Sequence, residues 1–220
     1  MRLRPIHTAI VWKASLVGGS ILNMLNLLTH YAVYPLIEVR FHGRGGQGVV
    51  VASEVLAEAA FSMGFEVSSF PFFGVERRGA PVTAYARIDD KPIRIKSSIY
   101  EPDYVVVLDN SLLRGVDVLE GLKPEGRVLI NYPDGKKLEG LDRRFRYFVL
   151  DATSIAAAHG IGSQTAPIVN TAIMGGFVKV CDIISLDAML ESIRQNAPVK
   201  EEENVSAATE AYERTREVQP

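Results

Sequence analysis

Short runs of β-branched and aromatic residues alternate with longer segments of helical apolar spacing from about residue 37 onward. This alternation is typical of a parallel sheet covered by helices. The runs expected to form strands are 36–41, 65–70, 82–88, 93–95, 103–108, 127–131 and 146–150. The segments expected to form helices are 47–60, 111–122, 153–159, 166–184 and 186–195. The pattern predicts an α/β fold: a Rossmann-like open, mostly parallel sheet with helices on both faces and a β-hairpin insertion, whose arms are 82–88 and 93–95.

Three parts of the chain differ in composition. Residues 1–36 contain no acidic residue and are expected to be a disordered or loosely helical extension outside the main domain, for which an upstream translation start is one explanation. A secretory signal is disfavoured because polar residues interrupt the apolar stretch, which is also too short and polar to span a bilayer. Residues 37–200 are expected to form the main domain. In 201–220, with Ala207, Ala208 and Tyr212 as candidate anchors, the charges favour a solvated surface helix.

Charge and cysteine content exclude several classes of function. The chain has 24 Lys and Arg against 26 Asp and Glu, a net charge of −2, so it has no basic excess for binding nucleic acid. The single cysteine, Cys181, cannot form an internal disulfide and indicates a reducing compartment such as the cytoplasm. One thiol cannot hold an iron–sulfur cluster, and the four histidines lack zinc-site spacing. We therefore expect no metal or redox centre on this chain, and no membrane partner.

A glycine-rich segment follows the first predicted strand and begins the next helix. Glycines allow a tight turn, while free N–H groups, the helix dipole and an arginine favour a bound anion such as a phosphate. NAD is disfavoured because Glu66 lies at the beginning of the second strand, whereas the ribose-binding acid belongs at its end. A tight turn without a ligand is the alternative. The candidate cofactor-binding residues of this loop are Gly43, Arg44, Gly45, Gly46, Gln47 and Gly48.

Two other segments carry candidate binding residues. The segment 70–81 contains three phenylalanines and the trio Glu76, Arg77 and Arg78, and its arginines suit bidentate binding of a phosphate or carboxylate. Alternatively, Glu76 neutralises one arginine and the aromatic rings cover a sheet edge or a partner. Because this segment follows the second strand, we expect it at the same end of the sheet as the glycine loop. Asn170, near the start of a helix, is the third candidate, although close helix packing explains it equally well.

Taken together, segments 37–50, 70–82 and 170–175 resemble the gamma subunits of the 2-oxoacid:ferredoxin oxidoreductases, most of all those of four-subunit pyruvate:ferredoxin oxidoreductases. The resemblance extends from Leu36 to the C-terminal tail. It implies a role in converting pyruvate, coenzyme A and oxidised ferredoxin reversibly into acetyl-CoA, CO₂ and reduced ferredoxin. A gamma subunit belonging to, or shared with, a branched-chain 2-oxoacid (2-ketoisovalerate) enzyme is the alternative.

The same resemblance implies that the chemistry resides in other chains. Thiamine diphosphate, Mg²⁺ and [4Fe-4S] clusters are expected on alpha, beta and delta partner subunits, with coenzyme A as substrate and external ferredoxin as electron acceptor. This chain has no Gly-Asp-Gly signature for thiamine diphosphate, so we expect no catalytic residue on it and no activity of the isolated chain. Two more distant alternatives are a stand-alone NAD(P)-binding oxidoreductase and an assembly module whose glycine loop contacts no ligand.

Overall fold

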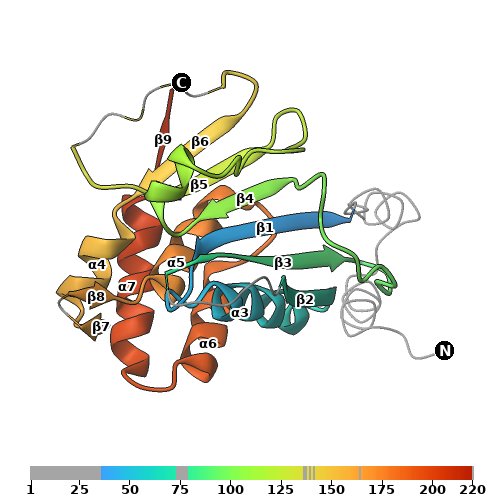
Figure 1. Cartoon of the computed structure of the whole chain (residues 1–220). Coiled ribbons are helices and arrows are strands. Elements are labelled where there is room, and N and C mark those ends of the chain that lie inside the picture. Colours follow the sequence, from blue (N-terminus) through green and yellow to red (C-terminus); the bar gives the residue numbers. More distant parts are fainter. Residues whose placement is uncertain are drawn as a thin grey trace, which may run out of the picture.

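The computed structural model describes residues 36–72, 79–135, 138, 140, 142–163 and 165–219. In this part of the chain one mixed sheet has the strand order β2-β3-β1-β4-β5-β6-β9 (Figure 1). Its strands are β1 (Ile37–Arg44), β2 (Glu66–Phe72), β3 (Pro81–Asp89), β4 (Tyr104–Val107), β5 (Arg127–Asn131), β6 (Arg146–Leu150) and β9 (Arg216–Val218). The helices are α3 (Val49–Ser62), the 3-10 helix η1 (Asn110–Arg114), α4 (Ala152–Ala158), α5 (Asn170–Val180), α6 (Leu186–Asn196) and α7 (Glu201–Arg214), and the short strands β7 (Gly162–Ser163) and β8 (Ala166–Pro167) pair separately. Of the expected N-terminal extension, 1–35 lies outside the described residues.

Four parallel strands form the centre of the sheet. β1 pairs with β4, β4 with β5 and β5 with β6 in parallel, whereas β3, β2 and β9 join in antiparallel orientation. Val105, Val106 and Val107 of β4 are fully buried because both faces of this strand are covered, which is what a continuous apolar run predicts. The predicted α/β class with a parallel centre is confirmed.

The β-hairpin is formed by β2 and β3, and not by 82–88 and 93–95 as expected from the sequence. β3 pairs with β2 along one edge and with β1 along the other, so no edge of β3 is left for a further strand. Residues 93–95 have no strand structure. The following segment is instead held by Arg87, which donates to the Ser97 carbonyl at 2.8 Å and pairs with Glu38 at 2.8 Å.

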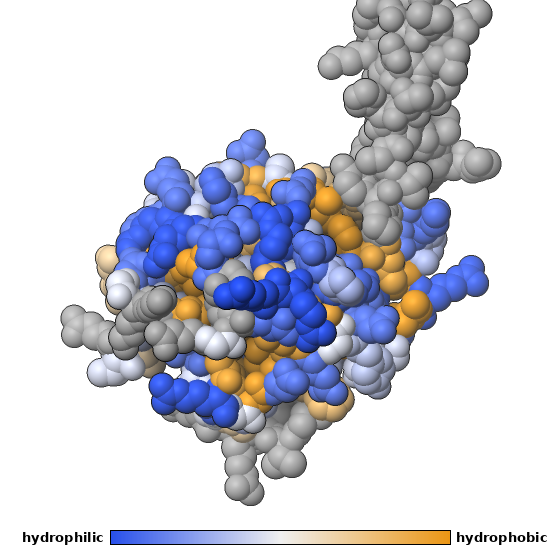
Figure 2. Space-filling view, turned by 90° about the horizontal axis from the view of Figure 1, so that it is seen from above, coloured by the Kyte–Doolittle hydropathy of each residue, from blue (hydrophilic) through white to orange (hydrophobic). Residues whose placement is uncertain are grey.

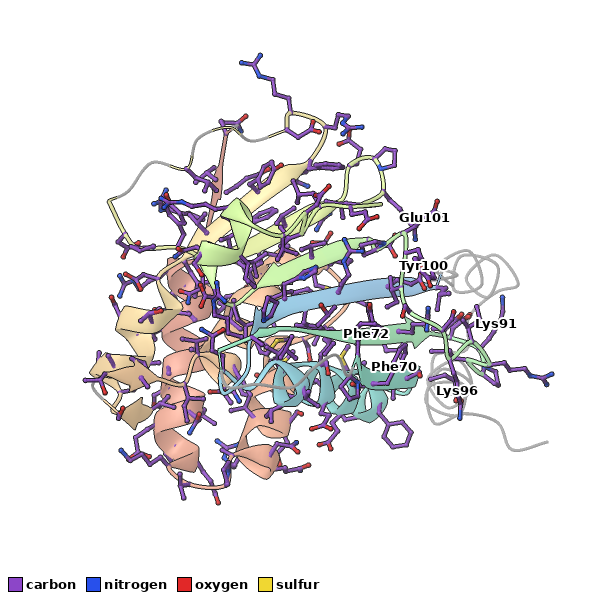
Figure 3. The ribbon with its side chains drawn as sticks, in the orientation of Figure 1. Phe70, Phe72, Lys91, Lys96, Tyr100 and Glu101 are labelled. Atoms are coloured by element: carbon purple, nitrogen blue, oxygen red, sulfur yellow. The ribbon has the colours of Figure 1, made fainter. Side chains whose placement is uncertain are left out.

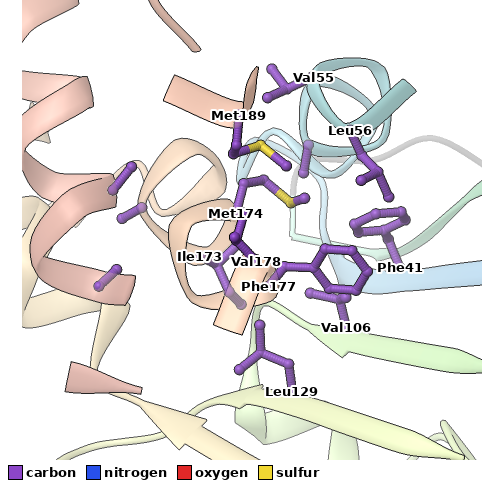
Figure 4. Packing of buried hydrophobic residues seen from close by; sticks show 14 of the residues in the cluster. Phe41, Val55, Leu56, Val106, Leu129, Ile173, Met174, Phe177, Val178 and Met189 are labelled. Carbon is purple, nitrogen blue, oxygen red and sulfur yellow. The ribbon is translucent and has the colours of Figure 1, made fainter. Parts of the chain in front are cut away.

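The α-helices of the described residues pack on one face of the sheet. Their apolar side chains join one large buried cluster with residues of β1, β3, β4, β5 and β6. In Figure 4 the Phe177 ring of α5 lies among Phe41, Val106 and Leu129, which come from β1, β4 and β5. A second, smaller cluster on the opposite face contains η1 and the turns after it, where the sequence predicted an α-helix over 111–122.

A buried cation organises part of that opposite face. Arg40 of β1 is only 7% exposed, and no buried carboxylate neutralises it within hydrogen-bond distance in the described part of the chain. Its guanidinium donates instead to the carbonyls of Val118 at 3.1 Å and Glu120 at 2.5 Å, and to His42 Nε2 at 3.1 Å. Burial first, and then the charge of Arg40, lower the pKa of His42 to about 3. The imidazole is therefore neutral and acts as a hydrogen-bond acceptor at neutral pH.

Helix α7 is part of the same core. Ala207, Ala208 and Ala211 are fully buried, so the expectation of a solvated surface helix is wrong for this side of α7. The helix approaches α5 so closely that a Cβ atom added at Gly175 would collide with the Ala208 carbonyl. After α7, β9 completes the sheet against β6, so residues beyond 200 supply both a helix layer and an edge strand.

Gly175→Ala is expected to lower the free energy of unfolding by about 1–3 kcal/mol, because the new methyl group meets backbone that cannot move aside. Alanine is otherwise the better helix former, by about 1 kcal/mol, so a loss of stability isolates the packing effect. Urea denaturation of the full chain measures it. Gly115→Ala, where an added Cβ meets open space, is the matched control and should change stability by less than about 0.5 kcal/mol. An unchanged Gly175→Ala midpoint would contradict the close packing of α5 and α7.

The neutral His42 predicts a pH dependence of stability. The unfolded chain takes up a proton near pH 6.5, whereas the folded chain does so only near pH 3, so stability falls as the pH drops through 6.5. Between pH 7 and pH 5 the wild type should lose about 2 kcal/mol more than His42→Gln, which keeps a hydrogen-bond acceptor for Arg40. Urea denaturation at the two pH values tests this, and equal losses in both proteins would refute it.

Candidate functional site

The glycine loop forms the predicted turn from strand to helix. Gly43 and Arg44 end β1, and α3 begins at Val49. Gly46 and Gly48 have φ angles of 97° and 75°, which is the left-handed region that favours glycine. The N–H groups of the first helical turn have no partner within the helix and lie at the positive end of its dipole. The loop therefore has the local geometry of an anion-binding turn.

Side chains at this turn form a closed ring of interactions. The Arg44 amide donates to Gln47 Oε1 at 2.7 Å, and Gln47 Nε2 donates to Asp109 Oδ2 at 2.9 Å. The same carboxylate oxygen lies 3.3 Å from Arg44 Nε. Burial raises the pKa of Asp109, but hydrogen bonds from Ser111 and Gln47, together with the charge of Arg44, outweigh this effect and hold the pKa below its usual value. Asp109 is thus an anion built into the site.

Sequence reasoning did not single out Asp109. A signal was present, because this acid lies two residues after the buried strand β4, and polar residues that follow parallel strands meet at one edge of the sheet. It also caps η1, since its Oδ1 accepts from the Ser111 amide at 2.9 Å.

The second predicted segment meets the glycine loop at its described end. Gly45 N donates to the Ala80 carbonyl at 2.9 Å, and Gly79 N donates to the Gly45 carbonyl at 3.2 Å. Arg44 Nη1 donates to the Gly79 carbonyl at 2.9 Å. Strand β2 ends at Phe72, and the next described residue of the segment, Gly79, lies at the glycine loop. The candidate residues Glu76, Arg77 and Arg78 lie outside the described residues.

Asn170, the third candidate, is brought to the same place. It is the first residue of α5, is 8% exposed, and its Oδ1 accepts from the Thr171 amide at 2.8 Å. Its amide group lies against Gly48, where a Cβ atom would collide with it. The first turns of α3 and α5, neither of which contains an acidic residue, therefore meet at Gly48. Two helix N-termini that converge in this way favour a negatively charged ligand group.

Other surface features lie apart from these residues. A cavity of about 460 Å³ is bounded by the turns after η1, Ile130, Leu138 and Tyr147, and none of the glycine-loop residues lines it. Figure 2 shows apolar residues at the surface between hydrophilic ones on the face seen from above. Lys91, Lys96, Tyr100 and Glu101 lie beyond the end of β3, at the opposite end of the sheet from the glycine loop, whereas Phe70 and Phe72 belong to β2 (Figure 3).

The described residues also limit the chemistry of the chain. They contain no group of three His, Cys, Asp or Glu side chains that would hold a metal ion. Burial raises the pKa of the Cys181 thiol to about 11, so this cysteine is not a reactive thiolate at neutral pH. In the part of the chain that was searched, no helix is both long enough and apolar enough to cross a bilayer.

Comparison with known proteins shows to which family the chain belongs. Residues 38–214 match the family model described as pyruvate ferredoxin/flavodoxin oxidoreductase. The pyruvate/ketoisovalerate oxidoreductases common subunit gamma of Pyrococcus furiosus is 53% identical over 184 residues, which cover 82% of this chain and 97% of that protein. Pyruvate synthase subunit PorC of Methanothermobacter thermautotrophicus is 48% identical over 179 residues, or 81% and 95% of the two chains.

The crystal structure of pyruvate oxidoreductase subunit PORC from Thermotoga maritima has the same fold. It matches with a TM-score of 0.71 and 34% sequence identity, and the match covers 84% of this chain and all of that one. The family model thus extends over the glycine loop, Asn170 and α7. The chain belongs to the pyruvate ferredoxin/flavodoxin oxidoreductase family, among its gamma-type subunits.

Proposed function

We propose that this chain is the gamma subunit of a multi-chain 2-oxoacid:ferredoxin oxidoreductase that converts pyruvate and coenzyme A into acetyl-CoA and CO₂ and reduces ferredoxin, reversibly. The observation that carries the proposal is 53% identity to a common gamma subunit across 97% of that protein. The site supports it, because the glycine loop and two helix N-termini, which are suited to a phosphate group, lie together.

A second substrate class has its own support. The relative from Pyrococcus furiosus is a subunit common to pyruvate and ketoisovalerate oxidoreductases. The second candidate function is therefore a gamma chain that also serves a branched-chain 2-oxoacid complex.

The chain's own contribution is binding and orientation. We assign thiamine diphosphate, Mg²⁺ and the [4Fe-4S] clusters to alpha, beta and delta partner subunits, where they supply decarboxylation and electron transfer. The single buried thiol of Cys181 cannot bind a cluster. On this chain the backbone of Gly43–Gly48, Asn170 and the trio Glu76–Arg78 form the surface that faces a phosphate of coenzyme A. The cytoplasm is the compartment that suits a free cysteine and a ferredoxin partner.

Native purification tests the subunit assignment. A tagged chain isolated gently from its own cell should bring with it a cysteine-rich, ferredoxin-like chain and a chain with a Gly-Asp-Gly signature, both identified by mass spectrometry. The complex should reduce ferredoxin only when pyruvate and coenzyme A are both present, and the isolated chain should not. Adding 2-ketoisovalerate in place of pyruvate, and counting the distinct partner sets, decides whether one or two complexes share the chain. A monomer that reduces ferredoxin unaided would overturn the assignment.

Arg77→Ala in the assembled complex is expected to raise the KM for coenzyme A about tenfold and the KM for pyruvate much less, because a charge-assisted bond to a phosphate contributes roughly 1.5–3 kcal/mol. Steady-state kinetics of ferredoxin reduction measures both constants. Arg94→Ala removes an exposed arginine that lies in sequence between Lys91 and Lys96, which are at the opposite end of the sheet from the glycine loop, and should change neither constant. Unchanged coenzyme A kinetics in an intact Arg77→Ala complex would remove this residue from the cofactor surface.

A further inference from the structure

We propose that Arg44 is a positioning residue of this site. Its guanidinium holds Gly79, near the end of the segment 70–81, and the start of η1 against the glycine loop. In this way Arg44 sets the geometry of the cofactor-facing surface without itself binding phosphate. This inference rests on the proposed function for what the surface binds. The fastening itself follows from contacts within this chain.

Every nitrogen of the Arg44 guanidinium already has a partner. Nη1 donates to the Gly79 carbonyl at 2.9 Å, and Nη2 donates to Ser111 Oγ at 2.8 Å. Nε lies 3.2 Å from the same hydroxyl and 3.3 Å from Asp109 Oδ2. These partners belong to two segments, 79–80 and 109–111, that are far from residue 44 in sequence. The planar, five-donor fork of arginine can bridge both at once, which the single ammonium group of lysine cannot do.

The charge of Arg44 is also neutralised within the site. Asp109 is 20% and Arg44 34% exposed in their side chains, so the pair is only partly screened by water. Because its hydrogen bonds hold the pKa of Asp109 below its usual value, the carboxylate is ionised at neutral pH. An arriving phosphate would meet a paired guanidinium beside a negative charge, which repels it. Bidentate recognition of a phosphate uses two parallel N–H donors of one guanidinium, whereas on Arg44 Nε and one N–H of each terminal nitrogen are already bound within the chain.

Residues 79–80, at the end of the segment 70–81, are held against the glycine loop by backbone hydrogen bonds as well as by the Arg44 side chain. Gly45 exchanges two hydrogen bonds with 79–80, from its amide to the Ala80 carbonyl and from the Gly79 amide to its carbonyl. Arg44 adds a third link at Gly79, one residue after the Glu76–Arg78 trio in the sequence. Loss of the Arg44 side chain therefore loosens the anchor next to Arg78 and leaves the strands in place.

Hydrogen–deuterium exchange of the full chain tests the fastening without any ligand. In Arg44→Ala the amide of Gly79 should exchange about tenfold faster, because a charge-assisted hydrogen bond that restrains it is gone. The buried strand β5 is the internal reference and should keep its wild-type exchange. Arg44→Lys should recover only part of the protection. Arg143→Ala, which removes an exposed arginine before β6, is the matched control and should leave Gly79 unchanged. Wild-type protection of Gly79 in Arg44→Ala would overturn the proposal.

Arg44→Lys separates positioning from direct binding in the assembled complex. Lysine keeps the positive charge, which would still attract a phosphate, but one ammonium group cannot bridge Gly79 and the 109–111 segment at once. If Arg44 positions the loops, Arg44→Lys and Arg44→Ala raise the KM for coenzyme A by comparable factors, with kcat and the KM for pyruvate changing less than about twofold. If Arg44 binds phosphate directly, Arg44→Lys keeps a KM for coenzyme A close to that of the wild type while Arg44→Ala raises it, which would refute the proposal.

Failure of the proposed function has a different signature. A wild-type complex that shows no turnover dependent on pyruvate and coenzyme A would refute the function, whereas the exchange of Gly79 would still decide whether Arg44 fastens the loops.

Discussion

The parallel pairing of β1 with β4 is the constraint on which the site depends. It sets His42 opposite Val107, and the ladder is extended by the Leu108 amide, which donates to the His42 carbonyl at 2.7 Å. The next residues along each strand therefore emerge at one edge of the sheet, where Arg44 and Asp109 meet. No short sequence motif brings Arg44 and Asp109 together. Their contact exists because two buried strands, β1 and β4, pair side by side and end together.

Much of the fold was predictable from the sequence, and the errors have physical causes. The central strand β4 was found because it is apolar on both faces, and the glycine loop because its spacing requires a tight turn. The strand at 93–95 was wrong because β3 already had a partner on each edge, which no local pattern reveals. The burial of α7 was missed because Ala207, Ala208 and Ala211 form a stripe whose small side chains match either a core or a solvated helix.

The candidate site was predictable only in part, because local patterns indicate turns and helix starts but not the contacts between them. Glycines at fixed spacing mark a turn, and Asn170 was found near a helix start, but their meeting at Gly48 is a tertiary contact between α3 and α5. The position of Asp109 after a predicted strand indicates which end of the sheet it occupies, but not which side chains it contacts. Only the sheet order shows that it reaches Arg44 and Gln47. The two faces of the sheet also differ in a way that periodicity did not show, since Arg40 and backbone carbonyls replace helix packing on one of them.

The close contact between Gly175 and Ala208 has a consequence for synthesis of the protein. Helix α5 packs over the central strands, yet much of its outer side is covered by α7, which begins at residue 201, and in the described part of the chain the outer edge of β6 is paired by residues 216–218. A nascent chain that has emerged only as far as α6 therefore exposes apolar surface and an unpaired strand edge to the cell. The native core therefore closes only once residues 201–218 have left the ribosome, and a premature stop codon after residue 200 would yield a polypeptide prone to aggregation.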